Sequence, residues 1–178
     1  MIKYLISART CILLLASGLL SSISYADLQP GEAVGIDFGT GSFAPNYNQY
    51  TTVNSTIANL VSLADGTTLT GVAVSTSNAG AIGPSPTAGA VPGIFHPDAA
   101  LHWIVRGGGN DFQITFSNLS SNSVYDLHGL IGDYPVDSIQ IVDNITLTAG
   151  SQTLSFGDSQ SGPNSVYFDD ISPNASGE

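Results

Sequence analysis

Short segments in which apolar and polar residues alternate limit what this chain can fold into. In 112–116 (FQITF), the apolar residues stand two apart with polar residues between them. This period matches a β-strand with one buried face and does not match a helix. Similar segments, separated by Gly, Asn, Asp, Ser and Pro clusters, lie at 34–38, 50–53, 68–75, 125–131, 139–141, 145–147, 154–156 and 166–168. The pattern predicts an all-β fold, an antiparallel two-sheet sandwich of jelly-roll type.

Two segments depart from this alternation and favour short helices in the connections. In 55–63 (STIANLVSL), Ile57, Leu60 and Val61 have helical spacing and Ser55 is a suitable N-cap. Residues 97–103 (PDAALHW) have room for one or two helical turns. Residues 78–93, rich in Ala, Gly and Pro, predict a long surface loop, and Gly71 shifts the alternation within 68–75, which indicates a β-bulge.

The first 26 residues have the three parts of a secretory signal peptide. Lys3 and Arg9 provide a basic start, an uncharged apolar run follows at 11–20, and Ser24-Tyr25-Ala26 fits a cleavage site before Asp27. The apolar run is shorter than the roughly 20 residues of a membrane-spanning helix, so we expect no membrane span in the mature chain. Removal of 26 of the 178 residues leaves 152, enough for one β-sandwich domain at 27–178. The stretch 172–178 (SPNASGE) is typical of a turn after a strand, which leaves open that further strands follow.

The predicted mature chain is very acidic and has no cysteine. Arg106 is its only Lys or Arg against 14 Asp and Glu, a formal charge of −13, and the only cysteine, Cys11, lies in the signal. Nucleic acids and anionic membrane surfaces are therefore excluded as partners, because both need clustered Lys and Arg. Without disulfides, the domain must be stabilised by core packing, backbone pairing or a bound cation. The charge repels itself unless salt screens it or a cation such as calcium neutralises it.

Two motifs that suggest an enzyme stand in the wrong context. Residues 34–41 (VGIDFGTG) resemble the first phosphate loop of actin-like ATPases, but they follow an export signal in a chain far shorter than those enzymes. Residues 156–159 (FGDS) resemble the nucleophile block of GDSL-type esterases. No His follows Ser159 to act as its base, and a serine without a base is a poor nucleophile. Both motifs are interpreted as strands that run into turns.

The metal-binding candidates are mainly carboxylates. Asp169 and Asp170 are close in sequence to Asp158, and calcium takes six to eight oxygen ligands of this type. One structural calcium at these three residues and ordinary solvated turns both remain open. The three histidines, at 96, 102 and 128, could form a zinc site with Asp98, but their spacing matches no known ligand pattern, so loop and sheet-face positions are favoured.

The ligand-binding candidates are Tyr47, Tyr50 and Tyr134, which stand beside Asn or Asp in expected loops, together with Arg106. A tyrosine ring in a loop can stack on a sugar. Arg106 could bind a ligand carboxylate or pair with an aspartate, and the pair is favoured. Trp103 has apolar residues on both sides and is expected in the core.

The order of several short segments resembles the extracellular sandwich domains of PEP-CTERM-type exported bacterial proteins. The segments are 36–39 (IDFG), 46–48 (NYN), 60–66 (LVSLADG), 114–119 (ITFSNL) and 125–127 (YDL). The resemblance implies a fold like that of galactose-binding or carbohydrate-binding modules, and a role at the cell surface or with exopolysaccharide. It names no catalytic residue. The sorting tail of that family, Pro-Glu-Pro with an apolar helix and an Arg cluster, does not occur in this sequence.

We therefore expect an exported, non-enzymatic domain that associates with extracellular polysaccharide. One alternative is a structural or adhesive surface module whose acidic loops bind calcium. The other is a glycan-cleaving enzyme, which needs two carboxylates facing each other across a cleft; Asp126, Asp133 and Asp137 are the candidates near strand ends.

Overall fold

Strands are the only regular elements in the described part of this computed structural model, which comprises residues 2–9, 28–40, 44–84, 102–106, 111–131, 145–156 and 164–178. The predicted all-β class is confirmed for these residues. The strands are β1 (Ile2–Arg9), β2 (Ala33–Phe38), β3 (Asn48–Tyr50), β4 (Thr56–Ile57), β5 (Ala73–Ser77), β6 (Ala79–Pro84), β7 (His102–Arg106), β8 (Gln113–Ser117), β9 (Val124–Ile131), β10 (Ile145–Ala149), β11 (Gln152–Phe156) and β12 (Asn164–Ile171). The strand expected at 139–141 lies outside the described residues.

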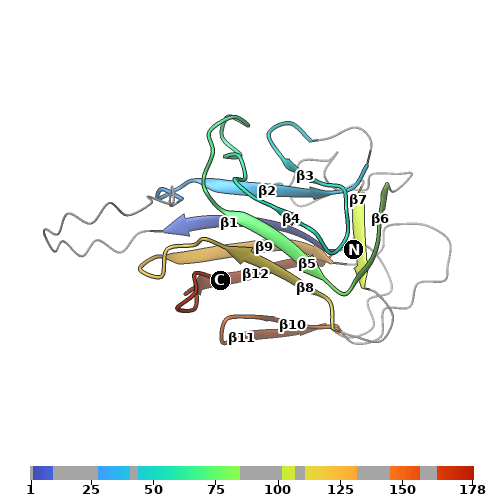
Figure 1. Cartoon of the computed structure of the whole chain (residues 1–178). Coiled ribbons are helices and arrows are strands. Elements are labelled where there is room, and N and C mark those ends of the chain that lie inside the picture. The colour runs from blue at the N-terminus through green and yellow to red at the C-terminus, as the bar shows by residue number, and fades with distance from the viewer. Residues whose placement is uncertain are drawn as a thin grey trace, which may run out of the picture.

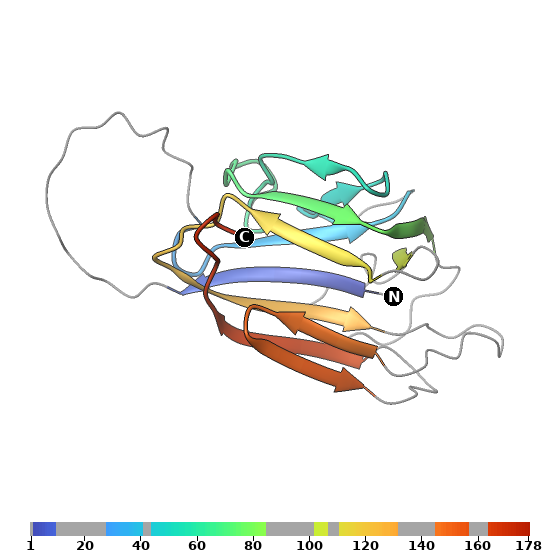
Figure 2. The ribbon, with the colours of Figure 1, turned by 60° about the horizontal axis from the view of Figure 1, so that its bottom comes forward.

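A five-stranded sheet is the largest unit of the fold, with the order β12-β9-β1-β2-β3. β1 runs antiparallel to both of its neighbours, β9 and β2, whereas β2 and β3 are parallel. A smaller sheet, β4-β5-β8, lies over one face of the large sheet (Figures 1 and 2). Two antiparallel pairs, β6–β7 and β10–β11, complete the described strands.

The core lies between the two larger sheets. β2 contributes Val34, Ile36 and Phe38, and β5 contributes Val74, all with no exposed surface. They belong to one cluster with Tyr125 of β9 and Phe116 of β8, so the apolar faces of both sheets meet there. β2 is buried on its other face as well, since Asp37 also has no exposed surface.

The hydroxyl of Tyr50 connects three segments beneath the small sheet. It contacts the carbonyl oxygen of Ser55, accepts hydrogen bonds from the backbone N–H groups of Ser55 (3.1 Å) and Thr76 (3.0 Å), and lies 3.0 Å from Thr76 Oγ1. The ring is fully buried against Phe38, with 5.3 Å between the ring centroids. This one side chain therefore joins β3, the following turn and β5.

The side chain of Asn48, two residues before Tyr50, also connects separate segments of the chain. Its amide nitrogen donates to the carbonyl oxygens of Gly35 (3.1 Å) and Val61 (3.0 Å), and its Oδ1 accepts the N–H of Val61 (2.8 Å). The parallel pair β2–β3 is thereby connected to the segment that leads into the small sheet.

The prediction of a helix at 55–63 is wrong. Backbone groups there bond across to a distant segment: Leu60 N–H donates to Val72 O (2.8 Å), and Thr70 N–H donates to Leu60 O (2.9 Å). Asn59 has φ of 55°, which interrupts helical geometry. Long-range pairing satisfies the backbone and overrides a weak local preference for helix.

Three further expectations change in detail. Residues 79–84 of the expected loop form β6, which pairs with β7, so His102 and Trp103 lie on a strand and not in a helical turn. Residues 85–93 and 97–101 lie outside the described residues. The strand expected at 68–75 is divided, because Gly71 has φ of 74° between the Val61–Leu69 bridge and β5.

Replacing Tyr50 by phenylalanine should destabilise the fold by about 1–3 kcal/mol, because the part-buried N–H of Ser55 loses this acceptor and the N–H of Thr76 keeps only Ser55 O, at 3.2 Å. Urea unfolding followed by circular dichroism measures this change. Leu69→Ala is the matched control, since Leu69 is 59% exposed and should change stability little. Equal stability of Tyr50→Phe and the unsubstituted protein would contradict the role of the hydroxyl.

Asp65 should stabilise the fold only while its carboxylate is charged. It accepts hydrogen bonds from the hydroxyl of Thr68 (2.6 Å) and the N–H groups of Thr67 and Thr68 (2.9 Å each), which lower its pKa from 3.8 to about 2. Since the pKa is lower in the folded state, this stabilisation is complete above about pH 4 and is lost as the pH falls towards 2. Urea unfolding of Asp65→Asn and the unsubstituted protein should differ at pH 7 and converge near pH 2. A difference that does not depend on pH would contradict the prediction.

Candidate binding site

The outer face of β9 and β12 carries an exposed aromatic pair. Along β12, Val166 and Phe168 are buried, so the alternation places Tyr167 on the opposite face, where it is 42% exposed. Tyr167 is the cross-strand partner of His128 on β9. The two rings lie 4.3 Å apart between centroids, with an interplanar angle of 42°. We call His128 and Tyr167 the ring pair.

A buried carboxylate stands two residues before His128 on the same strand. Asp126 is 3% exposed, and its Oδ1 accepts the backbone N–H of Asp170 at 3.2 Å. Burial lowers the pKa of His128 from its ordinary value of 6.5, and the negative charge of Asp126 offsets part of that shift. At pH 7 the imidazole is therefore neutral and has one donor and one acceptor nitrogen.

An irregularity in β12 holds Asp126 in place. The register with β9 shifts between Phe168 and Ile171, and Asp170 has a positive φ of 50°. The shift turns the N–H of Asp170 towards Asp126. The side chain of Gln152 donates to the carbonyl oxygen of Asp169, which connects the β10–β11 hairpin to the same irregularity.

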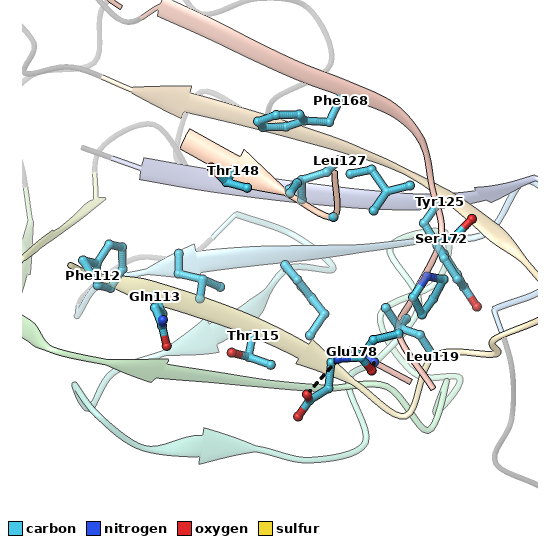
Figure 3. Close-up of a pocket in the computed structure, with 17 residues that line it drawn as sticks. Phe112, Gln113, Thr115, Leu119, Tyr125, Leu127, Thr148, Phe168, Ser172 and Glu178 are labelled. Carbon is cyan, nitrogen blue, oxygen red and sulfur yellow. Dashed lines mark hydrogen bonds between the residues drawn. The ribbon is translucent and has the colours of Figure 1, made fainter. Parts of the chain in front are cut away.

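A cleft of about 690 Å³ opens on the inner side of the same strands (Figure 3). Ile114 and Phe116 of β8 form one wall, and Leu127 of β9 and Phe168 of β12 form the other. Gln113, Thr115, Thr148 and Glu178 add polar groups to the lining. Among the described lining residues Glu178 is the only carboxylate, and it accepts a hydrogen bond from the side chain of Asn174 (3.2 Å).

In the part of the chain that the structure describes, the residues expected to bind a ligand are not gathered at one surface. Tyr50 is fully buried, which leaves no face of its ring for a sugar. Tyr47 is half-buried and packs over Gly35, where an added Cβ would come within 2.8 Å of the tyrosine ring. Arg106 ends β7, but its side chain is not among those described, and Tyr134 lies outside the described residues.

The metal candidates do not form a described cluster. Asp169 and Asp170 are exposed neighbours on β12, and Asp158 lies outside the described residues, as do Asp133, Asp137, His96 and Asp98. Within the ranges that the structure describes, no group of three or more His, Cys, Asp or Glu side chains is placed to hold a metal ion. The calcium site stays a prediction.

Tyr167 is the residue that the sequence analysis missed. Val166 and Phe168 were correctly given one face of a strand, and the same alternation puts Tyr167 on the other face. Alternation alone gives the face of Tyr167, whereas its partner on β9 follows only from the strand register.

No protein-family model, curated protein or solved structure matches this chain. In the part of the chain that the structure describes, no helix has the length and apolar character needed to cross a membrane.

Replacing Asp126 by asparagine should lower the pKa of His128 further, because the charge that raises it is removed. NMR titration of the His128 ring protons measures this pKa. Asp111→Asn is the control, since Asp111 is exposed just before β8, in the other sheet, and should leave the pKa of His128 unchanged. An identical His128 pKa in Asp126→Asn and the unsubstituted protein would show that Asp126 does not act on the imidazole.

Proposed function

We propose that this chain is an exported, non-enzymatic domain of jelly-roll type that binds extracellular polysaccharide on the outer face of β9 and β12. The observation that supports this proposal most directly is the ring pair, since Tyr167 presents an exposed aromatic surface on a sheet. A tyrosine combines an apolar ring, which stacks on the C–H face of a sugar, with a polar hydroxyl group. In this proposal the chain is a relative of the PEP-CTERM-type domains that it resembles.

The polar groups around the ring pair suit a hydroxyl-rich ligand. The neutral imidazole of His128 offers both a donor and an acceptor, and the exposed carboxylate of Asp169 follows on β12 two residues after Tyr167. Sugar hydroxyls both donate and accept hydrogen bonds, so such a mixture can orient a sugar stacked on Tyr167. The net charge of the domain favours neutral glycans, or acidic glycans bridged by calcium, over free polyanions.

Asp126 supports binding in preference to catalysis. It was a candidate carboxylate for a glycan-cleaving enzyme, but it is buried and bonded to the backbone of Asp170. A carboxylate held in this way acts on His128 through its charge.

The test is retention of the secreted, processed protein on immobilised bacterial and algal polysaccharides, with calcium and with a chelator. We expect retention on one glycan class and about fivefold weaker binding by Tyr167→Ala, because stacking by one ring contributes on the order of 1 kcal/mol. Leu69→Ala is the matched control, since it removes an exposed apolar side chain remote in sequence from the ring pair.

Three outcomes would count against the proposal. A folded protein that no glycan retains would favour a structural or adhesive surface module. Unchanged binding by Tyr167→Ala would move the site away from the ring pair. Release of shorter sugars from the retained glycan would indicate the enzyme.

A further inference from the structure

The centre of the large sheet is occupied by a segment that the sequence predicts to be removed on export. All eight residues of β1 pair with β9, from Ile2 opposite Ile131 to Arg9 opposite Val124. On its other edge, three residues of β1 pair with Ala33–Gly35 of β2. β1 lies entirely within residues 1–26, the predicted signal peptide, so cleavage before Asp27 would take the central strand away.

The two strands that flank β1 cannot replace it by a small movement. Both are antiparallel to β1 and are therefore parallel to each other, about two strand spacings or roughly 10 Å apart. Without β1, their facing N–H and C=O groups lose their partners next to a common core that contains Ile36 and Tyr125. Unpaired backbone groups at such a place are costly, so the position favours another strand.

We infer that, in the processed protein, the position between β2 and β9 is a strand-acceptor site that takes an extended segment of another polypeptide, antiparallel to both strands. This is recognition by β-strand addition, in which backbone hydrogen bonds supply affinity and alternate side chains supply specificity. The site does not depend on the proposed glycan binding, because it uses the strand edges of the sheet and not the ring pair.

The flanking strands define the chemistry of this partner. It spans about eight residues, the length over which β9 is paired. Positions opposite Tyr125 and Leu127 lie on the core face and call for apolar side chains, whereas the position opposite Asp126 lies on the outer face.

Charge determines which polypeptide fits best. The processed domain has a formal charge of −13, so a segment with Lys or Arg near its ends is attracted, whereas a second copy of the same acidic domain is repelled. The partner that we infer is therefore a basic, alternately apolar strand from a different protein.

The experiment uses the protein secreted and processed by a host, with a synthetic peptide of residues 1–10 (MIKYLISART) as the probe. Amide hydrogen exchange is followed in β2, β9 and β5 with and without the peptide. We expect a one-to-one complex by native mass spectrometry and at least tenfold slower exchange in β2 and β9. β5 is paired with β4 and β8 and not with β2 or β9, so its exchange should slow less. A peptide with Leu5→Pro and Ala8→Pro is the matched control. Residues of opposite parity donate to opposite neighbours, so the two prolines remove one donor to each flanking strand and should abolish protection.

If the processed protein is poorly folded on its own, circular dichroism provides a second measurement. Recovery of its β-sheet circular dichroism on addition of the peptide, but not of the proline peptide, supports the acceptor site. Failure of the peptide to change either exchange or circular dichroism overturns it.

Three further results overturn all or part of the inference. N-terminal sequencing that finds residues 2–9 in the secreted protein would make β1 a permanent strand of the domain. A processed monomer in which β2 and β9 are fully protected without any peptide would show that the sheet closes by itself. A dimer formed by the processed protein alone would overturn the choice of partner, because a second copy would then fill the position.

Discussion

The pairing of β1 with β9 and β2 is the constraint on which the large sheet depends. β9 and β12 lie on one side of β1, and β2 and β3 lie on the other, and no other described pairing connects these two halves. The apolar core also extends from one side of β1 to the other, because Ile36 of β2 and Tyr125 of β9 belong to one buried cluster. A strand at this position therefore maintains both the backbone ladder and the continuity of the apolar face.

Polar side chains have a large part in connecting the described segments of this fold. Tyr50 and Asn48 each bond backbone groups from two other parts of the chain, and Asn54 exchanges two hydrogen bonds with the backbone of Ala79 (2.9 and 3.0 Å). Such contacts are directional, so they fix the relative positions of loops that an apolar core alone would leave adjustable. They also tolerate the high negative charge of the domain, because they use amides and hydroxyls and not ions.

The period of the sequence was sufficient to predict the strand class and the buried faces of β8 and β12, but not that β2 is buried on both faces. It was not sufficient for 55–63, because helical spacing is a local signal and the partners of Leu60 are residues ten and more positions away. Nor could it place Tyr50, which stands beside loop residues but is drawn inward by four polar partners. The ring pair was predictable in part: alternation gives the face of Tyr167, but only the register between β9 and β12 brings His128 opposite it.

The asparagines in the turns of this domain affect its long-term chemical stability. Of the six described residues other than glycine with positive φ, five are asparagines, including Asn54 and Asn78. Hydrolysis of an asparagine amide converts it to a carboxylate. At Asn54 that reaction would replace the amide nitrogen that donates to Ala79 O by a negatively charged oxygen facing the carbonyl. Each such event would add charge to an already acidic molecule and loosen the turn where it occurred. The asparagines that adopt positive φ in these turns are thus also the positions where hydrolysis of a side-chain amide would alter the turn.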